Sequence, residues 1–292
     1  MSQPTVSTPK LAFDATAEGA GTGATSPEDS GATPYERYAR LDVLHTLQQP
    51  RSKVPAELSF IVTTQVMELL FGLLRHEWTL AQRALREDDL PGALAALRRG
   101  THVQDVLNSS WDLLGTLTPV EFSAFRPVLG EASGFQSSAF LHLEFLVGNK
   151  SPRLLEMYQG APAVHQELAA ALRAPTLYDD ALALLTRRGV LAAQEAEEGD
   201  AAGAGRYRPR EAVQQAWHTV YTDPAAGELV TLAEALLDTA ERVTRWRQRH
   251  YASVKRSMGA KPGTGGSSGL AWLKAATEQD VFPELWTVRG EL

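Results

Sequence analysis

"AELSFIVTTQVMELLFGLLRHEWTLAQRALRED", residues 56–88, is a long segment without proline whose side chains recur with the period of a helix. The residues that share one face are Phe60, Thr64, Met67, Phe71 and Trp78. Side chains at this spacing point to the same side of an α-helix. The segment therefore predicts a long helix that buries one face in the core. The charged tripeptide at residues 75–77 is predicted to lie on its solvated edge.

Helical patterns continue on both sides of this segment, from Tyr35 almost to the end of the chain. A capping box is predicted after residue 117, with Thr118 as N-cap, Pro119 at the first helical position and Glu121 at the third. Residues 196–206 are polar and glycine-rich and predict a solvated loop. No run alternates with the period of a strand, so we expect an all-α fold. Further helices are expected at residues 90–117, 136–147, 163–173, 177–189 and 227–258.

The composition is that of an ordinary soluble protein, with 43% hydrophobic and 22% charged residues among 292. The net charge of −7 argues against an extended nucleic-acid surface, which needs clustered Lys and Arg. The sequence contains no cysteine. This excludes disulfides, cysteine nucleophiles, iron–sulfur clusters and thiolate-held haem. Any metal or haem must be held by histidine or carboxylate.

The N-terminal residues 1–34 are rich in Ala, Gly, Thr, Ser and Pro and predict a disordered tail. They contain no apolar signal core, and the chain has no uninterrupted run of about 18 apolar residues. We therefore expect a cytoplasmic protein that does not bind a membrane. The rest of the chain, residues 35–292, is expected to form one helical domain.

His250 is the histidine most suggestive of a cofactor, because Val243, Trp246 and Val254 lie on the same side of its predicted helix. A lone histidine on an apolar face is more often a core residue than a ligand. A haem, however, is also held on its proximal side by one imidazole. No HExxH motif or three-histidine cluster supports a non-haem metal instead. Both interpretations of His250 stay open on these residues alone.

Other candidates have equally plain structural interpretations. Arg126 follows an apolar run, and arginine there is ordinarily a surface charge, although its planar fork also suits a substrate carboxylate. Tyr35 and Tyr38 are aromatic residues that can simply pack at the start of a helix. Thr264 lies in the glycine-rich stretch "GAKPGTGGSSG", residues 259–269, which lacks the Lys-Ser/Thr ending of a nucleotide-binding loop.

Four motifs in a fixed order identify a family. They are "YERYARLDVLHTLQ" (35–48), "FIVTTQVMELLF" (60–71), "LTPVEFSAFRPVLGEASGFQS" (117–137) and "RHYASVKRSMGAKPGTGGSSG" (249–269). With them, the chain resembles the tryptophan 2,3-dioxygenase family, the haem-dependent oxygenases that open the indole ring. The similarity extends from Tyr35 to near the end of the chain. It implies an all-α bundle enclosing a haem b pocket, with O2 as co-substrate.

The resemblance also implies roles for residues at matching positions. His250 matches the proximal haem ligand and is therefore the expected metal ligand. Ser133 and Gly134 match the loop over the haem edge and are expected to bind the cofactor. Phe60 and Phe122 match walls of the indole pocket.

The amino-acid end of the substrate is assigned in the same way. Arg126 matches the arginine that pairs with the substrate carboxylate. Thr264 matches the threonine that binds the amino-acid end, so that the glycine-rich stretch resembles a lid. Tyr35 and Tyr38 match tyrosines that reach into the neighbouring subunit's site, which implies a homotetramer.

Two departures from the family pattern leave the substrate and product open. The family has a histidine where this chain has Thr64, on the distal side, and Thr64 is therefore the candidate catalytic position that differs. Within "GFQSSAFL" (134–141), Ala139 and Leu141 replace Gln and Arg. The expected activity is dioxygenation of the indole C2=C3 bond of L-tryptophan or a substituted tryptophan to an N-formylkynurenine-type product. The alternatives are a monooxygenase that makes a 2-oxindole or hydroxylated product, and a non-catalytic sensor of haem or an amino acid.

Overall fold

A computed structural model describes residues 31–197, 207–259, 261 and 269–292. Within these ranges the regular structure is entirely helical, which confirms the predicted all-α class. The helices are α1 Pro34–Ala39, α2 Leu41–Leu44, α3 Ala56–Arg86, α4 Leu90–Leu114, α5 Pro119–Leu129, α6 Ser138–Leu146, α7 Pro162–Arg173, α8 Leu177–Arg187, α9 Ala193–Glu197, α10 Glu211–Thr222, α11 Gly227–Met258, α12 Leu270–Thr277 and α13 Pro283–Thr287, with short 3-10 helices η1 Gly134–Gln136, η2 Pro152–Tyr158 and η4 Val288–Gly290.

Contacts divide the chain into two units, residues 1–49 and 50–292. The first unit contains α1 and α2. Helix α1 begins with a capping box, in which Thr33 Oγ1 accepts from Glu36 N and Thr33 N donates to Glu36 Oε2. Most of the predicted N-terminal tail, residues 1–30, lies outside the described residues. The prediction of one domain from residue 35 onward stays a prediction.

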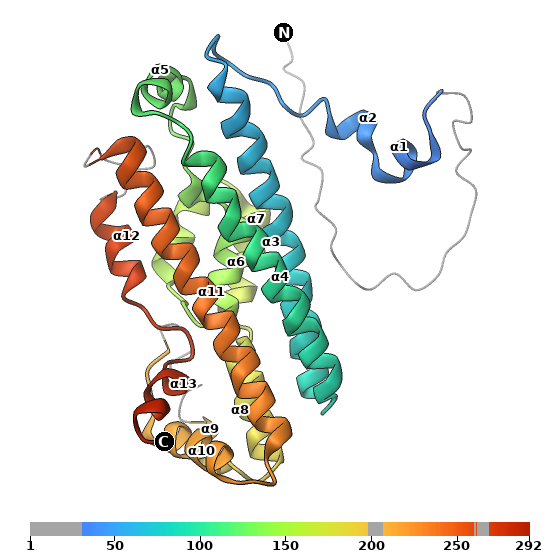
Figure 1. The fold of residues 1–292 in the computed structure, drawn as a ribbon, viewed down its shortest axis with the longest axis vertical. Helices are drawn as coiled ribbons and strands as arrows, with labels where there is room; N and C mark the ends of the chain where they lie inside the picture. Colours follow the sequence, from blue (N-terminus) through green and yellow to red (C-terminus); the bar gives the residue numbers. More distant parts are fainter. Residues whose placement is uncertain (1–30, 198–206, 260, 262–268) are drawn as a thin grey trace. The chain divides into compact units, whose positions relative to one another are not determined.

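The second unit is built on three long helices, α3, α4 and α11, which run side by side (Figure 1). Helix α4 can approach α3 closely because Gly100 has no side chain. A Cβ atom there would lie 3.2 Å from Trp78 Nε1. Helix α11 packs on α4, where Gln104 Nε2 donates to the Thr239 carbonyl over 3.1 Å. The hydrophobic core lies between these three helices and α8.

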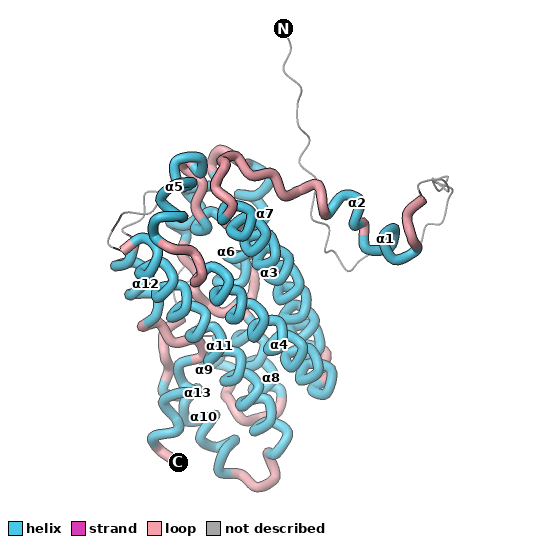
Figure 2. The backbone as a smooth tube through the Cα atoms, turned by 45° about the horizontal axis from the view of Figure 1, so that its top comes forward, coloured by secondary structure: helices cyan, strands magenta, loops and turns pink. Residues whose placement is uncertain are grey.

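The shorter helices cover this core. Helices α6 and α8 pack on α3, α7 packs on α6, and α12 packs on α11. Helix α10 contacts α11 and α13, and Figure 2 shows these elements together near the C-terminus. The second unit therefore has two ends. One is framed by α5 and α12, and the other by α10 and α13.

Sequence features within a few residues of one another correctly predicted where several helices begin or end. Helix α11 has the predicted bounds, and the capping box of Thr118 and Glu121 is present at the start of α5 with Pro119 at its first turn. The helix predicted over 136–147 is instead η1 followed by α6. The break arises because Ser137 is the N-cap of α6, where its hydroxyl accepts from Phe140 N over 3.0 Å.

Two sequence predictions need correction. Glu77 is buried rather than solvated, because Arg99 of α4 folds over it with a nitrogen–oxygen distance of 2.8 Å. The predicted loop over 196–206 begins too early, since α9 extends to Glu197. The remainder of that loop lies outside the described residues.

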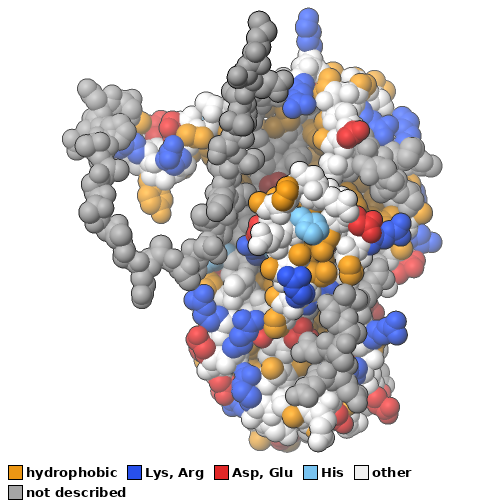
Figure 3. Space-filling view, turned by 180° about the vertical axis from the view of Figure 1, so that it is seen from behind, with side chains coloured by type: hydrophobic (Ala, Val, Ile, Leu, Met, Phe, Trp, Pro, Cys, Tyr) orange, Lys and Arg blue, Asp and Glu red, His pale blue; other side chains and the backbone are white. Residues whose placement is uncertain are grey.

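Helix α3 is long and apolar enough, by length and composition, to cross a membrane. Polar residues such as Thr63 and Glu68 interrupt the segment, so it is not a continuous run of apolar residues. A core helix of a soluble protein meets the same criterion, and α3 does supply core residues. The face in Figure 3 mixes Lys and Arg with Asp and Glu, and apolar side chains lie between them.

Candidate functional site

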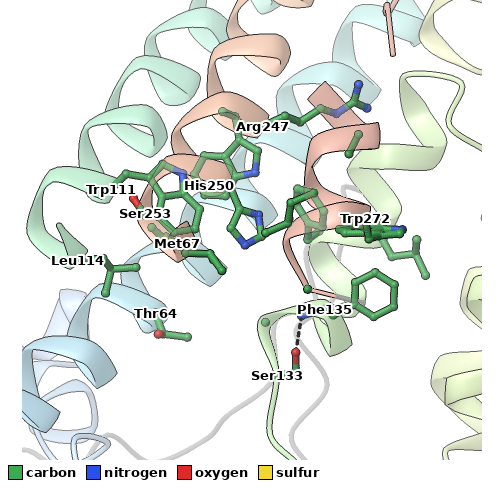
Figure 4. Close-up of a pocket in the computed structure, with 18 of the residues that line it drawn as sticks. Thr64, Met67, Trp111, Leu114, Ser133, Phe135, Arg247, His250, Ser253 and Trp272 are labelled. Carbon is green, nitrogen blue, oxygen red and sulfur yellow. Dashed lines mark hydrogen bonds between the residues drawn. The ribbon is translucent and has the colours of Figure 1, made fainter. Parts of the chain in front are cut away.

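A cavity of about 340 Å³ lies in the second unit, between α3, α4, α5, α6, α11 and α12. Six of the residues predicted for the site line it: Phe60, Thr64, Phe122, Ser133, Gly134 and His250. Figure 4 shows Thr64 and Met67 on α3, with Ser133 and Phe135 on the opposite side of the cavity. The fold therefore brings together residues from three of the four sequence motifs, residues 60–71, 117–137 and 249–269, which are far apart in the chain.

One wall of the cavity is an aromatic cluster between α3 and α5. Phe60 lies 6.0 Å from Phe122 and 5.4 Å from Phe125, measured between ring centroids. Phe122 and Phe125 are themselves 5.3 Å apart in an edge-to-face arrangement. Tilted and edge-to-face contacts of this kind fix ring positions and add to the hydrophobic burial. This wall suits a flat apolar group.

His250 projects from α11 into the cavity, and its ring stacks on Trp111 of α4 with centroids 4.7 Å apart (Figure 4). The residue is only half-buried because its ring faces the cavity, yet protein atoms surround that ring on its other sides. Burial lowers the pKa of His250 to about 4, since the charged imidazolium loses its hydration. The imidazole is therefore neutral at physiological pH, with one ring nitrogen available as an electron-pair donor.

Two indoles lie near His250: Trp246, which the sequence already placed on the same face of the helix, and Trp111 of α4, which no sequence signal marked. Trp246 lies 4.9 Å from Trp111 and 5.4 Å from Phe71, between ring centroids. Trp111 Nε1 and Trp246 Nε1 are both buried and have no hydrogen-bond partner among the described residues. An unpaired buried N–H is costly, so its presence marks this wall as a place where a further polar group is expected.

These residues fit a haem. The described residues contain no cluster of three His, Cys, Asp or Glu side chains that would hold a metal ion unaided. A single neutral imidazole suffices for haem, because the porphyrin supplies the in-plane ligands of its iron. The apolar walls and the unpaired indole N–H groups suit the large conjugated ring and its polar edge. His250 is the residue that would hold it.

Thr64 lines the cavity one helical turn after Phe60. Its hydroxyl donates to the Phe60 carbonyl over 2.8 Å, so its proton is held within α3. The oxygen can still accept a hydrogen bond, but a threonine hydroxyl is not a base at neutral pH. Leu141, where the family pattern has Arg, also lines the cavity and is buried. Thr64 in place of histidine and Leu141 in place of arginine both make this part of the cavity less polar than the family pattern implies.

A buried ion pair forms another part of the lining. Arg247 Nη2 donates to Glu144 Oε2 over 2.9 Å, and Arg247 Nη1 donates to the Gln279 carbonyl over 2.9 Å. Both charged side chains are almost completely buried. This pair ties α11 to α6 and to the segment after α12. No local sequence pattern predicts this ion pair, because its partners are 103 residues apart.

The remaining predicted residues are not placed at the cavity. Arg126 lies on α5, one turn beyond Phe122, is half-buried, and is not among the described lining residues. Thr264 and most of its glycine-rich stretch lie outside the described residues. Tyr35 and Tyr38 belong to the first unit, where they are 71% and 91% exposed. Their assigned roles stay predictions.

Comparison with known proteins gives a consistent result. The family described as tryptophan 2,3-dioxygenase matches residues 18–188 and 183–292. The chain is 42% identical over 259 residues to the tryptophan 2,3-dioxygenase of Burkholderia pseudomallei strain 668, covering 88% of this chain and 84% of that protein.

A second relative agrees. The tryptophan 2,3-dioxygenase of Burkholderia mallei strain SAVP1 is 40% identical over 259 residues, with the same coverage of 88% of this chain and 84% of that protein. Similarity of this extent covers every element that forms the cavity. The chain belongs to the tryptophan 2,3-dioxygenase family.

Proposed function

We propose that this enzyme is a haem-dependent dioxygenase of L-tryptophan or a substituted tryptophan. Both atoms of O2 would be added across the indole C2=C3 bond, which opens the ring to an N-formylkynurenine-type product. The observation that carries the proposal is the neutral His250, whose pKa burial lowers to about 4, at the wall of an apolar cavity. Bound haem supplies the activation of O2.

The chain's own contribution is to bind and orient the substrate. The indole would lie against the ring cluster of Phe60 and Phe122, which excludes water from the ring. Arg126 would pair with the substrate carboxylate, and Thr264 would bind the amino-acid end. Arg126 is one turn from Phe122 on α5, so ring contact and carboxylate contact would come from the same helix.

Thr64 would act by position rather than as a base. Its hydroxyl proton is held by the Phe60 carbonyl, so it offers only an accepting oxygen to a substrate. A short side chain also leaves more room than an imidazole. This room favours a substituted ring, and a comparison of L-tryptophan with ring-methylated analogues in the natural enzyme and in Thr64→His tests it. Identical preferences in both proteins would make Thr64 a neutral replacement.

We further propose a cytoplasmic homotetramer. Helix α3 exposes an apolar stripe, defined by Leu58, Val62, Val66, Leu69 and Leu73, which are 36–50% exposed. A contiguous apolar stripe on a helix supports a protein–protein interface. The exposed Tyr35 and Tyr38 support the idea that the N-terminal unit completes a neighbouring subunit's site. Light scattering that detects an active monomer would refute this assembly.

Product analysis with labelled oxygen tests the activity. Reduced, haem-loaded protein is incubated with L-tryptophan and ¹⁸O2, and the product mass is measured. Two labelled atoms support dioxygenation. One labelled atom indicates a monooxygenase, whose second oxygen atom leaves as water at the expense of two electrons. An unlabelled, unconverted substrate that nevertheless binds would indicate a sensor.

A further inference from the structure

Glu68 is a cavity-lining carboxyl that the proposed function does not use. It lies on α3, one turn after Thr64 and two turns after Phe60, and all three residues line the cavity. Among the described lining residues the other charged groups are Glu144 and Arg247, which pair with each other at 2.9 Å. Glu68 has no such ion pair among the described residues, so its carboxyl is available to a bound ligand.

The surroundings of Glu68 orient this carboxyl. The Ser137 hydroxyl hydrogen-bonds Glu68, and the same hydroxyl accepts from Phe140 N as the N-cap of α6. Because the cap occupies the accepting side of the hydroxyl, its proton is left for Glu68. Tyr158, whose pKa is raised to about 12 by burial and by Glu68, donates to the Gln136 carbonyl instead. The Ser137 hydroxyl thus holds the carboxyl of Glu68 in place, and the carboxyl oxygens can still accept a hydrogen bond from a ligand.

Position along α3 indicates which part of a substrate reaches Glu68. Phe60, at one end, contacts Phe122 of α5, the helix that also carries Arg126. At 1.5 Å per residue, Glu68 lies about 12 Å farther along the axis of α3. A substrate held at α5 by its carboxylate would lay the near edge of its indole on Phe60 and Phe122 and would point the far edge of the ring, rather than its charged end, toward Thr64 and Glu68.

We propose that Glu68 accepts a hydrogen bond from the indole N–H of the substrate and so determines specificity for a ring with a donor at that position. This rests on the proposed function, because it takes the substrate to be a tryptophan. An indole N–H in an apolar cavity needs an acceptor, since an unpaired buried donor is costly. The Thr64 oxygen is a neutral acceptor, whereas a carboxylate forms the stronger, charge-assisted bond.

The experiment compares two ligands that differ only in this donor. L-tryptophan and its benzothiophene analogue, in which sulfur replaces the ring N–H, are titrated into haem-loaded protein by calorimetry. The proteins are the natural enzyme, Glu68→Gln, Glu68→Leu and the control Glu87→Gln. Glu87 is an exposed carboxylate at the C-terminal end of the same helix.

We expect the natural enzyme to prefer L-tryptophan. Loss of a charge-assisted bond should weaken L-tryptophan binding roughly 10- to 150-fold in Glu68→Leu, and less in Glu68→Gln, whose amide oxygen still accepts. Binding of the benzothiophene analogue should change by less than about threefold. Glu87→Gln should leave both ligands unaffected. Glu68→Gln preserves the shape of the side chain and decides the question if Glu68→Leu does not fold.

Two results would overturn the inference. Equal losses for both ligands would show that Glu68 supports the cavity rather than the N–H, and an unchanged preference would place the acceptor elsewhere. In either case the natural enzyme still binds L-tryptophan and the proposed function survives. Failure of the natural enzyme to bind L-tryptophan at all would overturn both proposals together.

Discussion

The two ends of the helical unit treat buried polar groups in opposite ways. At the α10–α13 end, Glu284 is completely buried but accepts from Tyr207 Oη at 2.6 Å, Tyr178 Oη at 3.1 Å and Arg210 N at 2.9 Å. At the cavity end, the indole nitrogens of Trp111 and Trp246 have no described partner. Unpaired groups of this kind reduce stability. These two indoles line the cavity, where a bound group can reach them, whereas Trp78 Nε1, which is also unpaired, does not line it.

The pKa shifts follow the same division. Burial and the neighbouring Glu284 both raise the pKa of Tyr207, which keeps its phenol protonated as a donor to that carboxylate. Burial alone lowers the pKa of His250 to about 4. At the α10–α13 end, the carboxylate of Glu284 has its hydrogen-bond partners within the protein. At the cavity end, the imidazole of His250 is neutral and faces the cavity, where a ligand would bind.

The largest effect is expected at the cavity end, where one substitution should remove haem binding and leave the fold intact. His250→Ala should abolish the absorption spectrum of histidine-ligated haem, and activity with it, because no other histidine is among the described residues that line the cavity. The fold should remain, since a desolvated imidazole contributes little to stability. Haem titration and circular dichroism measure the two properties. An unchanged haem spectrum would contradict the assignment, and His102→Ala, an exposed histidine on α4, is the matched control.

The next largest effect is expected for Glu284→Ala, which should lower the free energy of unfolding and leave haem binding unchanged. Glu284→Ala leaves the donors Tyr178, Tyr207 and Arg210 N unsatisfied, at about 1–3 kcal/mol each. We therefore expect a loss of about 3 kcal/mol or more in the free energy of unfolding, measured in urea. Haem binding by the folded fraction should be unchanged. A variant as stable as the natural protein would show that this network is not needed for the fold.

Arg126→Ala tests the proposed substrate contact. Loss of a charge-assisted bond costs about 1.5–3 kcal/mol, so kcat/KM should fall roughly 10- to 150-fold. Tryptamine, which lacks the carboxylate, should lose a similar factor with the natural enzyme and little more with the variant. Turnover of tryptamine at the rate of the amino acid would refute the contact.

The smallest effect is a pH dependence at Glu68. Burial raises the pKa of this carboxyl, and the Ser137 hydrogen bond offsets only part of the shift. The folded protein therefore binds more protons than the unfolded chain between the ordinary pKa and the raised one, so this group favours folding increasingly as pH falls through that window. Glu68→Gln should be relatively more stable than the natural protein at neutral pH, and the difference should disappear at low pH. Urea titrations at several pH values measure it, and a difference independent of pH would contradict it.

The fold could be predicted wherever the signals are local. The bounds of α11 and the capping box of α5 depend on neighbouring residues, and both were predicted correctly. The burial of Glu77 was missed because it depends on Arg99, which comes from the next helix. Helix α12 was not predicted individually, because it has only 8 residues and is stabilised by packing on α11. Helix α10 was also missed, although with 12 residues it is as long as α7, which was predicted.

The site could be predicted only where a motif marked a residue. Phe60, Thr64, Phe122 and His250 were named from the sequence and line the cavity. Trp111 was not named, although it lies in a predicted helix, because its stacking on His250 depends on how α4 packs against α11. Glu68 lies within a motif, but nothing in the sequence marks it as a site residue, since an acidic residue on a helix is ordinarily solvated.

The packing of α11 on α4 also has a consequence for the order of events during synthesis. Gln104 and Thr239, which join the two helices, are 135 residues apart in the chain. The ribosome therefore completes the hairpin of α3 and α4 long before it synthesises α11, which carries His250. Contacts of such high sequence separation form late and slowly. A haem-competent cavity is thus a late product of folding, and N-terminal fragments that end before α11 should be helical yet unable to retain the cofactor.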